Sequence, residues 1–293
     1  MDGFVNLLKP PGMTSSDAVL FVRRLLPRGT RVGHLGTLDP DAAGVLPVSV
    51  GKATRLFDYA VDGGKEYIAE ALFGIRTDTQ DVQGKVLTRE QASVRPEDIQ
   101  SLLPRLTGTI DQIPPAYSAL QQNGRRLYDL AREGAAIDIA PRKARVGAFE
   151  LLEQTRPDRY LFRIECGKGV YIRTLIHDLG NLLGCGAAMS FLLRTRSGVF
   201  GLEEAHTVEE LADCADWDRI LLPMDAPVAF MPRVDVGADY EKRARCGNPF
   251  PADTADKTGF VRVYLGGAFA GIGEAAEDGT VRFRAMLLRE KAE

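Results

Sequence analysis

Long apolar runs are absent from this chain of 293 residues, because no stretch of about 18 consecutive hydrophobic residues occurs in it. The sequence therefore predicts no membrane-spanning helix, and the N-terminal MDGFVNLLKPPGMT has neither the charged nor the apolar region of a signal peptide. We expect a cytoplasmic protein. Cysteine is also scarce, and the four cysteines form no C-x-x-C pair: Cys166, Cys185, Cys214 and Cys246. Their spacing argues against a disulfide framework or a zinc finger, and favours small hydrophobic or incidental thiols.

Motifs that bind cofactors are missing as well. The chain has no Rossmann glycine pattern, no phosphate-binding glycine loop with its lysine, and only three histidines, none at metal-ligand spacing. We therefore expect an activity that uses no redox cofactor, no nucleotide cofactor and no metal ion.

The charge is small overall, with a net value of −3, but it is distributed unevenly. Residues 101–200 carry 14 Lys and Arg against nine Asp and Glu, whereas residues 201–225 carry one arginine and eight acids. Within the basic part, residues 121–145 hold six basic side chains against three acidic ones. Because the distribution decides how a surface meets a nucleic acid, this segment is a candidate RNA-binding region.

Hydrophobic periodicity predicts an α+β protein. Helices are expected over residues 15–27, 170–184 and 206–216, and strands over residues 65–74, 144–153 and 159–167. Ser15 or Ser16 can cap the first helix, Gly184 can stop the second and Thr207 can cap the third. The regular alternation of strand and helix that builds a parallel sheet is missing, so we expect a mixed, mainly antiparallel sheet.

A proline-punctuated stretch, LLPMDAPVAFMPRVDV, separates this large part from the C-terminal end. Beyond it, residues 259–287 alternate apolar and polar side chains around a Gly-Gly turn and an Asp-Gly turn. That pattern predicts a small β-rich C-terminal domain of about 60 residues.

One short stretch, GHLGTLDPDAAG at residues 33–44, concentrates unusual residues. Pro40 fixes the backbone directly after Asp39, and Gly36 and Gly44 permit a bend that other residues resist. Taken alone, an aspartate in such a turn usually bonds its own backbone. Alternatively, the same turn can hold the Asp39 carboxylate in a fixed position as a catalytic group.

Six stretches in order decide between these interpretations. They are LLKPPGMTSSDAV, GHLGTLDPDAAGVLPVSVGKATR, KEYIAEALFG with RTDTQDVQG, QIPPAYSALQQNGRRLYDLAREG, GKGVYIRTLIHDLG and FLLRTRSGVF. Over residues 3–225 the chain resembles the TruB family of pseudouridine synthases. The resemblance implies a pseudouridine synthase catalytic domain at residues 1–228 with an RNA-binding insertion at about 115–145. It also implies a PUA-like RNA-binding domain at residues 229–293.

The resemblance implies an isomerase that converts the T-loop uridine of tRNA, at position 55, to pseudouridine. Such an enzyme breaks the N1–C1′ glycosidic bond, turns the uracil and rejoins it through C5. It needs an ionised carboxylate, a proton acceptor and a closed pocket. By their matching positions, Asp39 is the catalytic aspartate, Tyr67 stacks on the uracil and exchanges protons, and Arg173 keeps Asp39 ionised.

Further matching positions are expected to bind substrate. His34 would take the place of the extruded base, and Tyr171 and Leu193 would line the uridine pocket. Asp81 would hold a nearby loop, and Lys9 would brace the floor of the site. Arg125 and Arg126 would contact RNA phosphates from the insertion. The chain departs from the family at two positions, with Gln121 where lysine is common and Ala43 where threonine is frequent.

Three other functions are consistent with parts of the sequence. A non-catalytic protein could bind and remodel tRNA with the same fold, and a metal-dependent phosphoesterase could use His34, Asp39 and Asp41. A guide-RNA-dependent relative acting on ribosomal RNA is the third, although a short chain without a lysine-rich tail favours the stand-alone form. We expect the T-arm stem-loop of tRNA to suffice as partner, with a monomeric protein that requires no protein partner and no membrane.

Overall fold

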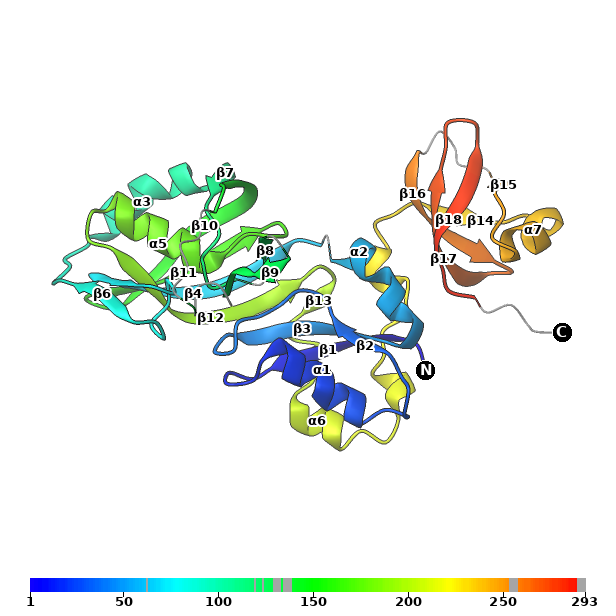
Figure 1. Ribbon diagram of the computed structural model, residues 1–293, viewed down its shortest axis with the longest axis horizontal. Helices are drawn as coiled ribbons and strands as arrows, with labels where there is room; N and C mark the ends of the chain where they lie inside the picture. Colours follow the sequence, from blue (N-terminus) through cyan, green and yellow to red (C-terminus); the bar gives the residue numbers. More distant parts are fainter. Residues whose placement is uncertain are drawn as a thin grey trace. The chain divides into compact units, whose positions relative to one another are not determined.

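The computed structural model describes residues 1–61, 63–118, 120–122, 124–128, 133, 139–252 and 258–288. The chain forms two compact units (Figure 1). The first contains Met1–Pro40, Val45–Gly63 and Gly198–Glu293, and the second contains Asp41–Gly44 and Gly64–Ser197. Over the described part of the chain, no helix has both the length and the apolar character needed to cross a membrane.

The second unit is built on an antiparallel sheet with the strand order β12, β4, β11, β10, β7 (Figure 1). In chain order these strands are β4 (Lys65–Phe73), β7 (Gly108–Gln112), β10 (Arg142–Arg156), β11 (Arg159–Cys166) and β12 (Ala187–Ser197). At the start of β3 (Ala43–Val50), Ala43 and Gly44 pair in parallel with Leu193 and Arg194 of β12. The predicted mixed, mainly antiparallel sheet is therefore confirmed.

Helices and short hairpins complete the second unit. They are β5 (Ile75–Thr77) with β6 (Val86–Arg89), α3 (Pro96–Leu102), η2 (Leu103–Leu106), β8 (Gln121–Gln122) with β9 (Arg125–Arg126), and α5 (Ile172–Leu182). Helix α5 packs against β12 and also contacts α3. The positive φ of Gly184 ends the turn after α5, as the sequence predicts.

The first unit begins with β1 (Gly3–Lys9) and β2 (Val32–His34), which both pair with β3. Helix α1 (Ser15–Arg24) begins at the predicted residue, but its cap is Thr14 and not Ser15 or Ser16, because Thr14 forms the capping box with Asp17. It also ends three residues before the predicted end. The N–H groups of Leu25 and Leu26 bond to the carbonyls of Val22 and Arg23, which closes a tight turn ahead of Pro27.

Short elements follow β3 and precede the C-terminal sheet in this unit. They are η1 (Gly51–Leu56), α2 (Phe57–Ala60), β13 (Phe200–Gly201), α6 (Val208–Ala212), η3 (Trp217–Arg219) and η4 (Ala226–Val228). Thr207 caps α6 through a capping box with Glu210, as its position in the sequence predicts.

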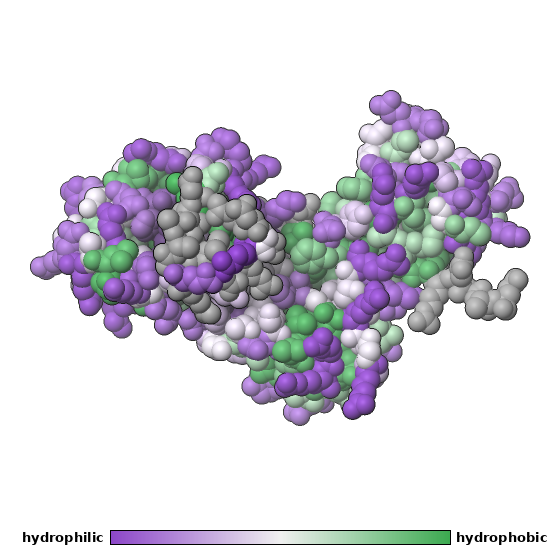
Figure 2. Space-filling model, viewed as in Figure 1, coloured by the Kyte–Doolittle hydropathy of each residue, from purple (hydrophilic) through white to green (hydrophobic). Residues whose placement is uncertain are grey.

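The C-terminal end forms a five-stranded sheet in the order β14, β16, β17, β18, β15, which confirms the predicted β-rich region. Its elements are β14 (Arg233–Asp235), η5 (Ala238–Tyr240), α7 (Glu241–Arg245), β15 (Phe250–Pro251), β16 (Gly259–Leu265), β17 (Ala268–Ala275) and β18 (Thr280–Met286). Val261, Val263 and Val281 are fully buried in its apolar core. Figure 2 shows hydrophilic side chains over most of the visible surface, with apolar side chains between them in separate groups.

Candidate active site

Asp39 lies in the loop between β2 and β3, and its backbone neighbours are fixed on both sides. On one side, the Leu38 N–H donates to Ser15 Oγ at 2.9 Å, and the Ser15 hydroxyl donates to the Leu38 carbonyl at 3.0 Å. On the other side, the Pro40 carbonyl accepts from the Gly12 N–H at 2.9 Å and from Lys9 Nζ at 2.9 Å. Side chains from α1 and β1 therefore hold the half-buried Asp39 from both directions.

Lys9 is fully buried, which is unusual for a lysine. Besides Pro40, its ammonium donates to the carbonyls of Pro10 at 2.8 Å and Met13 at 2.6 Å. These three bonds compensate for the loss of hydration of the buried charge. They also tie the KPPGM turn to the loop of Asp39.

The glycines of this loop adopt the conformations that the sequence predicts. Gly36 and Gly44 have φ values of 98° and 113°, which other residues rarely adopt. At Gly44 a side chain would also collide with β12, because a Cβ would lie 2.2 Å from the Arg194 carbonyl oxygen. His34 is half-buried at the end of β2, and its Cα pairs with that of Val48.

Tyr67 lies on β4 in the second unit and is only 6% exposed. Its direct neighbours across the sheet are Ile164 on β11 and Arg194 on β12. Side chains directly opposite one another in an antiparallel pair share a face of the sheet. Tyr67 and Arg194 therefore lie on the same face, and so does the buried Leu192, whose partner Ala69 is two residues after Tyr67.

Leu193 lies on the other face of this sheet, because its partner on β4 is Ile68. The pleat thus separates Leu193 from Tyr67, although the sequence analysis expects both to line one pocket. The neighbouring Leu192 occupies the equivalent position on the face of Tyr67. The role of Leu193 in the uridine pocket stays a prediction, and the shared face with Tyr67 makes Leu192 a further candidate.

Arg194 is a residue that the sequence analysis missed. Its side chain is fully buried. On the same face, burial raises the pKa of the Cys166 thiol to about 11, against the opposing effect of the positive charges of Lys65 and Arg194. A signal was present in FLLRTRS, since alternation places the residue two positions after the inward-facing Leu192 on the same buried face.

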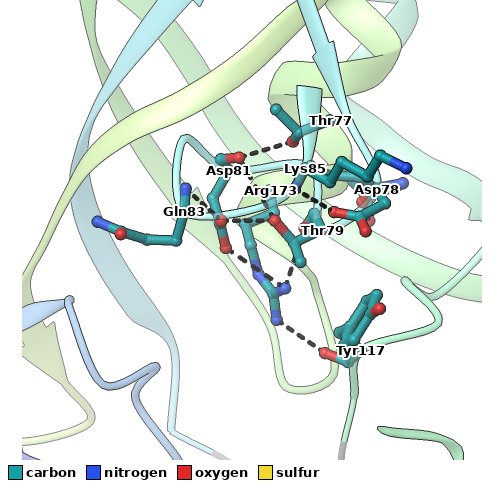
Figure 3. A network of polar contacts seen from close by, with 10 residues as sticks. Thr77, Asp78, Thr79, Asp81, Gln83, Lys85, Tyr117 and Arg173 are labelled. Carbon is teal, nitrogen blue, oxygen red and sulfur yellow. Dashed lines mark hydrogen bonds and ion pairs between the residues drawn. The ribbon is translucent and has the colours of Figure 1, made fainter. Parts of the chain in front are cut away.

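Arg173 stands in the first turn of α5, is 7% exposed, and binds the loop that follows β5 (Figure 3). Its guanidinium donates to the carbonyls of Thr79 and Tyr117, both at 3.1 Å, and lies 3.6 Å from Asp81 Oδ2. An arginine held by several partners has a fixed direction, which a free surface arginine lacks. The pairing of Arg173 with Asp39 stays a prediction.

Asp81 organises the same loop (Figure 3). Its Oδ1 accepts from the Thr79 hydroxyl at 2.6 Å and from the Gln83 N–H at 3.0 Å. Its own carbonyl accepts from the Thr77 hydroxyl at 2.6 Å. A loop with these bonds presents the Thr79 carbonyl to Arg173 in a defined position.

Tyr171 directly precedes α5 and is clamped through its backbone. The Tyr171 N–H donates to Gln112 Oε1 at 2.8 Å, and Gln112 Nε2 donates to the Tyr171 carbonyl at 3.0 Å. No motif in the sequence points to Gln112, which is 2% exposed at the end of β7. A contact between residues 59 positions apart leaves no local signal in the sequence.

The expected RNA-binding insertion is only partly described. Arg125 and Arg126 form β9, and the exposed Arg125 pairs with Glu133 at 2.5 Å. Nothing is described of the Arg126 side chain, and residues 119, 123, 129–132 and 134–138, which include Arg132, lie outside the described residues. Arg142, Lys143 and Arg145 are exposed on β10, where Lys143 pairs with Asp111 at 2.8 Å.

The outer face of the sheet carries a network of ion pairs. Arg163 on β11 lies 3.2 Å from Glu66, 2.8 Å from Glu150 and 2.5 Å from Glu165. The hydroxyl of Thr195 donates to Glu66 and is the largest influence that holds the pKa of this carboxyl below its usual value. These charges are partly hydrated, and Arg163 pairs with Glu66 and Glu150 across strands and with Glu165 along its own strand.

Two titratable groups on α5 are perturbed by burial. Burial lowers the pKa of His177, and it raises the pKa of the neighbouring Asp178 to about 6. Among the side chains that the structure describes, no three His, Cys, Asp or Glu residues converge as metal ligands do.

Sequence models of one family match almost the whole chain. The model described as "TruB family pseudouridylate synthase (N terminal domain)" matches residues 23–172. Two further models, "tRNA pseudouridylate synthase B C-terminal domain" and "Pseudouridine synthase II TruB, C-terminal", match residues 173–229 and 232–287.

Individual relatives are similar over most of the chain. The tRNA pseudouridine synthase B of Alkaliphilus oremlandii is 45% identical over 248 residues, which cover 85% of this chain and 82% of that protein. That of Moorella thermoacetica is 47% identical over 258 residues, covering 86% and 84%. Among solved structures, a chain of "Crystal Structure of a Cbf5-Nop10-Gar1 Complex" matches with a TM-score of 0.75 and 26% identity, covering 98% of this chain and 85% of that one.

Proposed function

Because the chain belongs to the TruB family of pseudouridylate synthases, we propose that it converts the T-loop uridine at position 55 of tRNA to pseudouridine. The isomerisation breaks the N1–C1′ bond and forms a C5–C1′ bond. The proton that leaves C5 is balanced by a proton taken up at N1. Chemistry of this kind needs an ionised carboxylate, a group that exchanges protons, and a pocket that excludes water.

Asp39 supplies the carboxylate in this proposal. The observation that carries it is the double attachment of the Asp39 loop, through Ser15 at Leu38 and through Lys9 at Pro40. A reacting group held in one place removes much of the entropic barrier to reaction. The role proposed for Lys9 is therefore positioning, since it acts through the backbone next to Asp39.

Arg173 is proposed to keep Asp39 ionised. A carboxylate in a dry pocket takes up a proton unless a cation stabilises its charge. The guanidinium of Arg173 is buried, and the carbonyls of Thr79 and Tyr117 fix its plane. Asp81 is proposed to act indirectly, because it orders the loop that binds Arg173.

Tyr67 is proposed to stack on the extruded uracil and to exchange protons through its hydroxyl. Leu192, Arg194 and Tyr171 are proposed as further residues of the uridine pocket. The support for the first two is the buried face of the sheet that they share with Tyr67. The clamp of Gln112 on the Tyr171 backbone supports a fixed position for the third.

His34 is proposed to fill the space that the uridine leaves, which offsets part of the unstacking cost of a few kcal/mol. Arg125 and Arg126 are proposed to contact phosphates of the T arm. We further propose residues 1–228 as the catalytic part and residues 229–293 as an RNA-binding domain. The protein would act as a monomer in the cytoplasm, where its tRNA substrate is found.

The test is release of tritium from tRNA that carries [5-³H]uridine. Wild type should release the label from a T-arm stem-loop as well as from whole tRNA, and release should persist with a strong chelator. Asp39→Asn should lose at least about 1,000-fold in rate, because the charge that acts in the transition state is gone. Its affinity for the same RNA should stay within a few-fold.

The matched control is Asp41→Asn, an exposed aspartate two residues further along the loop. It should release tritium at nearly the wild-type rate. Equal rates for wild type and Asp39→Asn would reject the mechanism. RNA binding by wild type without any release would instead identify a protein that remodels tRNA without catalysis.

A further inference from the structure

The turn between α1 and β2 forms a basic surface that the site described above does not include. Arg23 lies in the last turn of α1, Arg28 in the turn itself, and Arg31 directly before β2, and all three are exposed. Arg23 and Arg31 border a cavity of about 700 Å³, whose lining also includes Thr30, Ser49, Thr54 and Phe57. We call Arg23, Arg28 and Arg31 the α1–β2 surface.

A second cavity of about 690 Å³ adjoins the first, because Gly29, Thr30 and Arg31 line both. Its lining adds Arg28, Lys52 and Arg55. One acidic residue, Asp2, also lines it, and its Oδ1 accepts from the Lys52 N–H at 2.7 Å. The positive charges are thus concentrated around two adjoining hollows.

The arginines of the α1–β2 surface have no acidic partner within ion-pair distance among the residues that the structure describes. The sequence explains this, because residues 18–38 contain no Asp or Glu. Some other exposed arginines do have an acidic partner, as Arg95 has in Asp98 and Arg219 has in Asp216. The charge of the α1–β2 surface is therefore available to an external anion.

Guanidinium groups match the oxygens of a phosphodiester in a forked geometry, and several of them together track a nucleic-acid backbone. Phe57, at the rim of the same cavity, is 42% exposed and offers an aromatic face on which a base can stack. A basic groove beside an exposed aromatic ring is typical of RNA-binding surfaces.

The short distance along the chain between Arg31 and His34 indicates which part of the RNA would contact the α1–β2 surface. Arg31 precedes His34 by three residues on one extended segment, so their Cα atoms lie about 10 Å apart at about 3.3 Å per residue. We propose that the α1–β2 surface binds backbone phosphates of the stem that carries the target loop. This rests on the proposed function, in which His34 enters that loop.

The test compares two triple variants of equal charge. One is Arg23→Gln, Arg28→Gln, Arg31→Gln, and the control is Arg95→Gln, Arg163→Gln, Arg219→Gln, which removes arginines that have acidic partners outside the parts proposed to bind RNA. Binding is measured on a T-arm stem-loop whose target uridine is replaced by cytidine, at several salt concentrations. Turnover is measured separately with the uridine stem-loop.

The first variant should bind at least about tenfold more weakly at low salt. Its plot of log affinity against log salt should be shallower by about 0.7–0.9 for each phosphate that the variant no longer neutralises. The value of kcat at saturating RNA should not change, and the control variant should bind with the wild-type slope. An unchanged slope in the first variant would overturn the proposal.

A weakening that occurs only with whole tRNA, and not with the stem-loop, would also overturn it. The binding measurement does not depend on catalysis, because the RNA used for it carries cytidine in place of the target uridine. If wild type releases tritium normally and the Arg23/Arg28/Arg31 variant binds RNA as tightly as wild type, only the proposal for the α1–β2 surface is rejected. If the Arg23/Arg28/Arg31 variant binds RNA more weakly but wild type releases no tritium, only the proposed function is rejected.

Discussion

The two faces of the sheet formed by β12, β4 and β11 differ in how their charged side chains are hydrated. On the outer face, Arg163 is shared among three glutamates and remains partly hydrated. On the inner face, Arg194 is fully buried beside Tyr67 and Leu192. Partly hydrated pairs form at little net cost, whereas a buried guanidinium loses its hydration. An arginine kept on the inner face therefore has a role other than solubility.

The largest effect should come from the hydroxyl of Tyr67 on the inner face. Tyr67→Phe keeps the ring but removes the group proposed to exchange protons, so kcat should fall by about 100- to 1,000-fold. Single-turnover tritium release measures this, and thermal unfolding checks that the fold is intact.

Tyr160→Phe is the matched control on the adjacent strand and the same face. Its hydroxyl bonds the Val94 carbonyl, so it should cost about 1 kcal/mol of stability and leave kcat unchanged. If Tyr67→Phe turned over as fast as wild type, the proton-exchange role would be wrong and the inner face would serve stacking alone.

Two adjacent leucines sharpen the comparison. Leu192→Ala removes a buried side chain next to Tyr67, so it should cost about 2–5 kcal/mol in urea unfolding and lower kcat/KM. Leu193→Ala alters the outer face and should cost less than about 1.5 kcal/mol, with kcat/KM within a few-fold of wild type. Equal losses in both variants would contradict the assignment of the two residues to opposite faces.

The smallest effect is expected on the outer face. Arg163→Gln should lower the free energy of unfolding by about 1 kcal/mol or less, and the loss should shrink as salt screens the network. The same substitution at Arg194 should cost several-fold more, because it leaves buried polar groups without their partner. Chemical denaturation at low and high salt measures both. A salt-independent loss at Arg163 would mean that packing, not charge, dominates there.

Much of the fold could be predicted from local sequence. Period-two alternation in RYLFRIEC marks β11 with its end misplaced by one residue, and the glycines of the GTLDP loop have the positive φ that the pattern indicates. These features depend on a residue and its close neighbours in the chain, so one sequence contains them. The family resemblance assigns roles to Asp39, Tyr67 and Arg173, and these roles stay predictions.

Other features depend on partners that are distant in the chain. Ser15 was interpreted as a helix cap, yet its hydroxyl bonds Leu38, 23 residues away. Register shifts at Met189/Phe191 and Arg194/Arg196 interrupt the period of β12, so the face on which Leu192 and Leu193 lie depends on the pairing with β4 and not on local sequence. Alternation in FLLRTRS places Arg194 on the same face as Leu192, but that this face is the buried one depends on neighbouring strands, which no local pattern describes.

The attachment of Leu38 and Pro40 on either side of Asp39 has a consequence for how the reaction responds to temperature. The loop is already ordered when RNA arrives, so no part of the binding energy is spent on arranging its backbone. Wild type should therefore show a small entropic barrier in the chemical step. Loosening the loop by Ser15→Ala would make that barrier more entropic, even where the RNA is held as tightly as before.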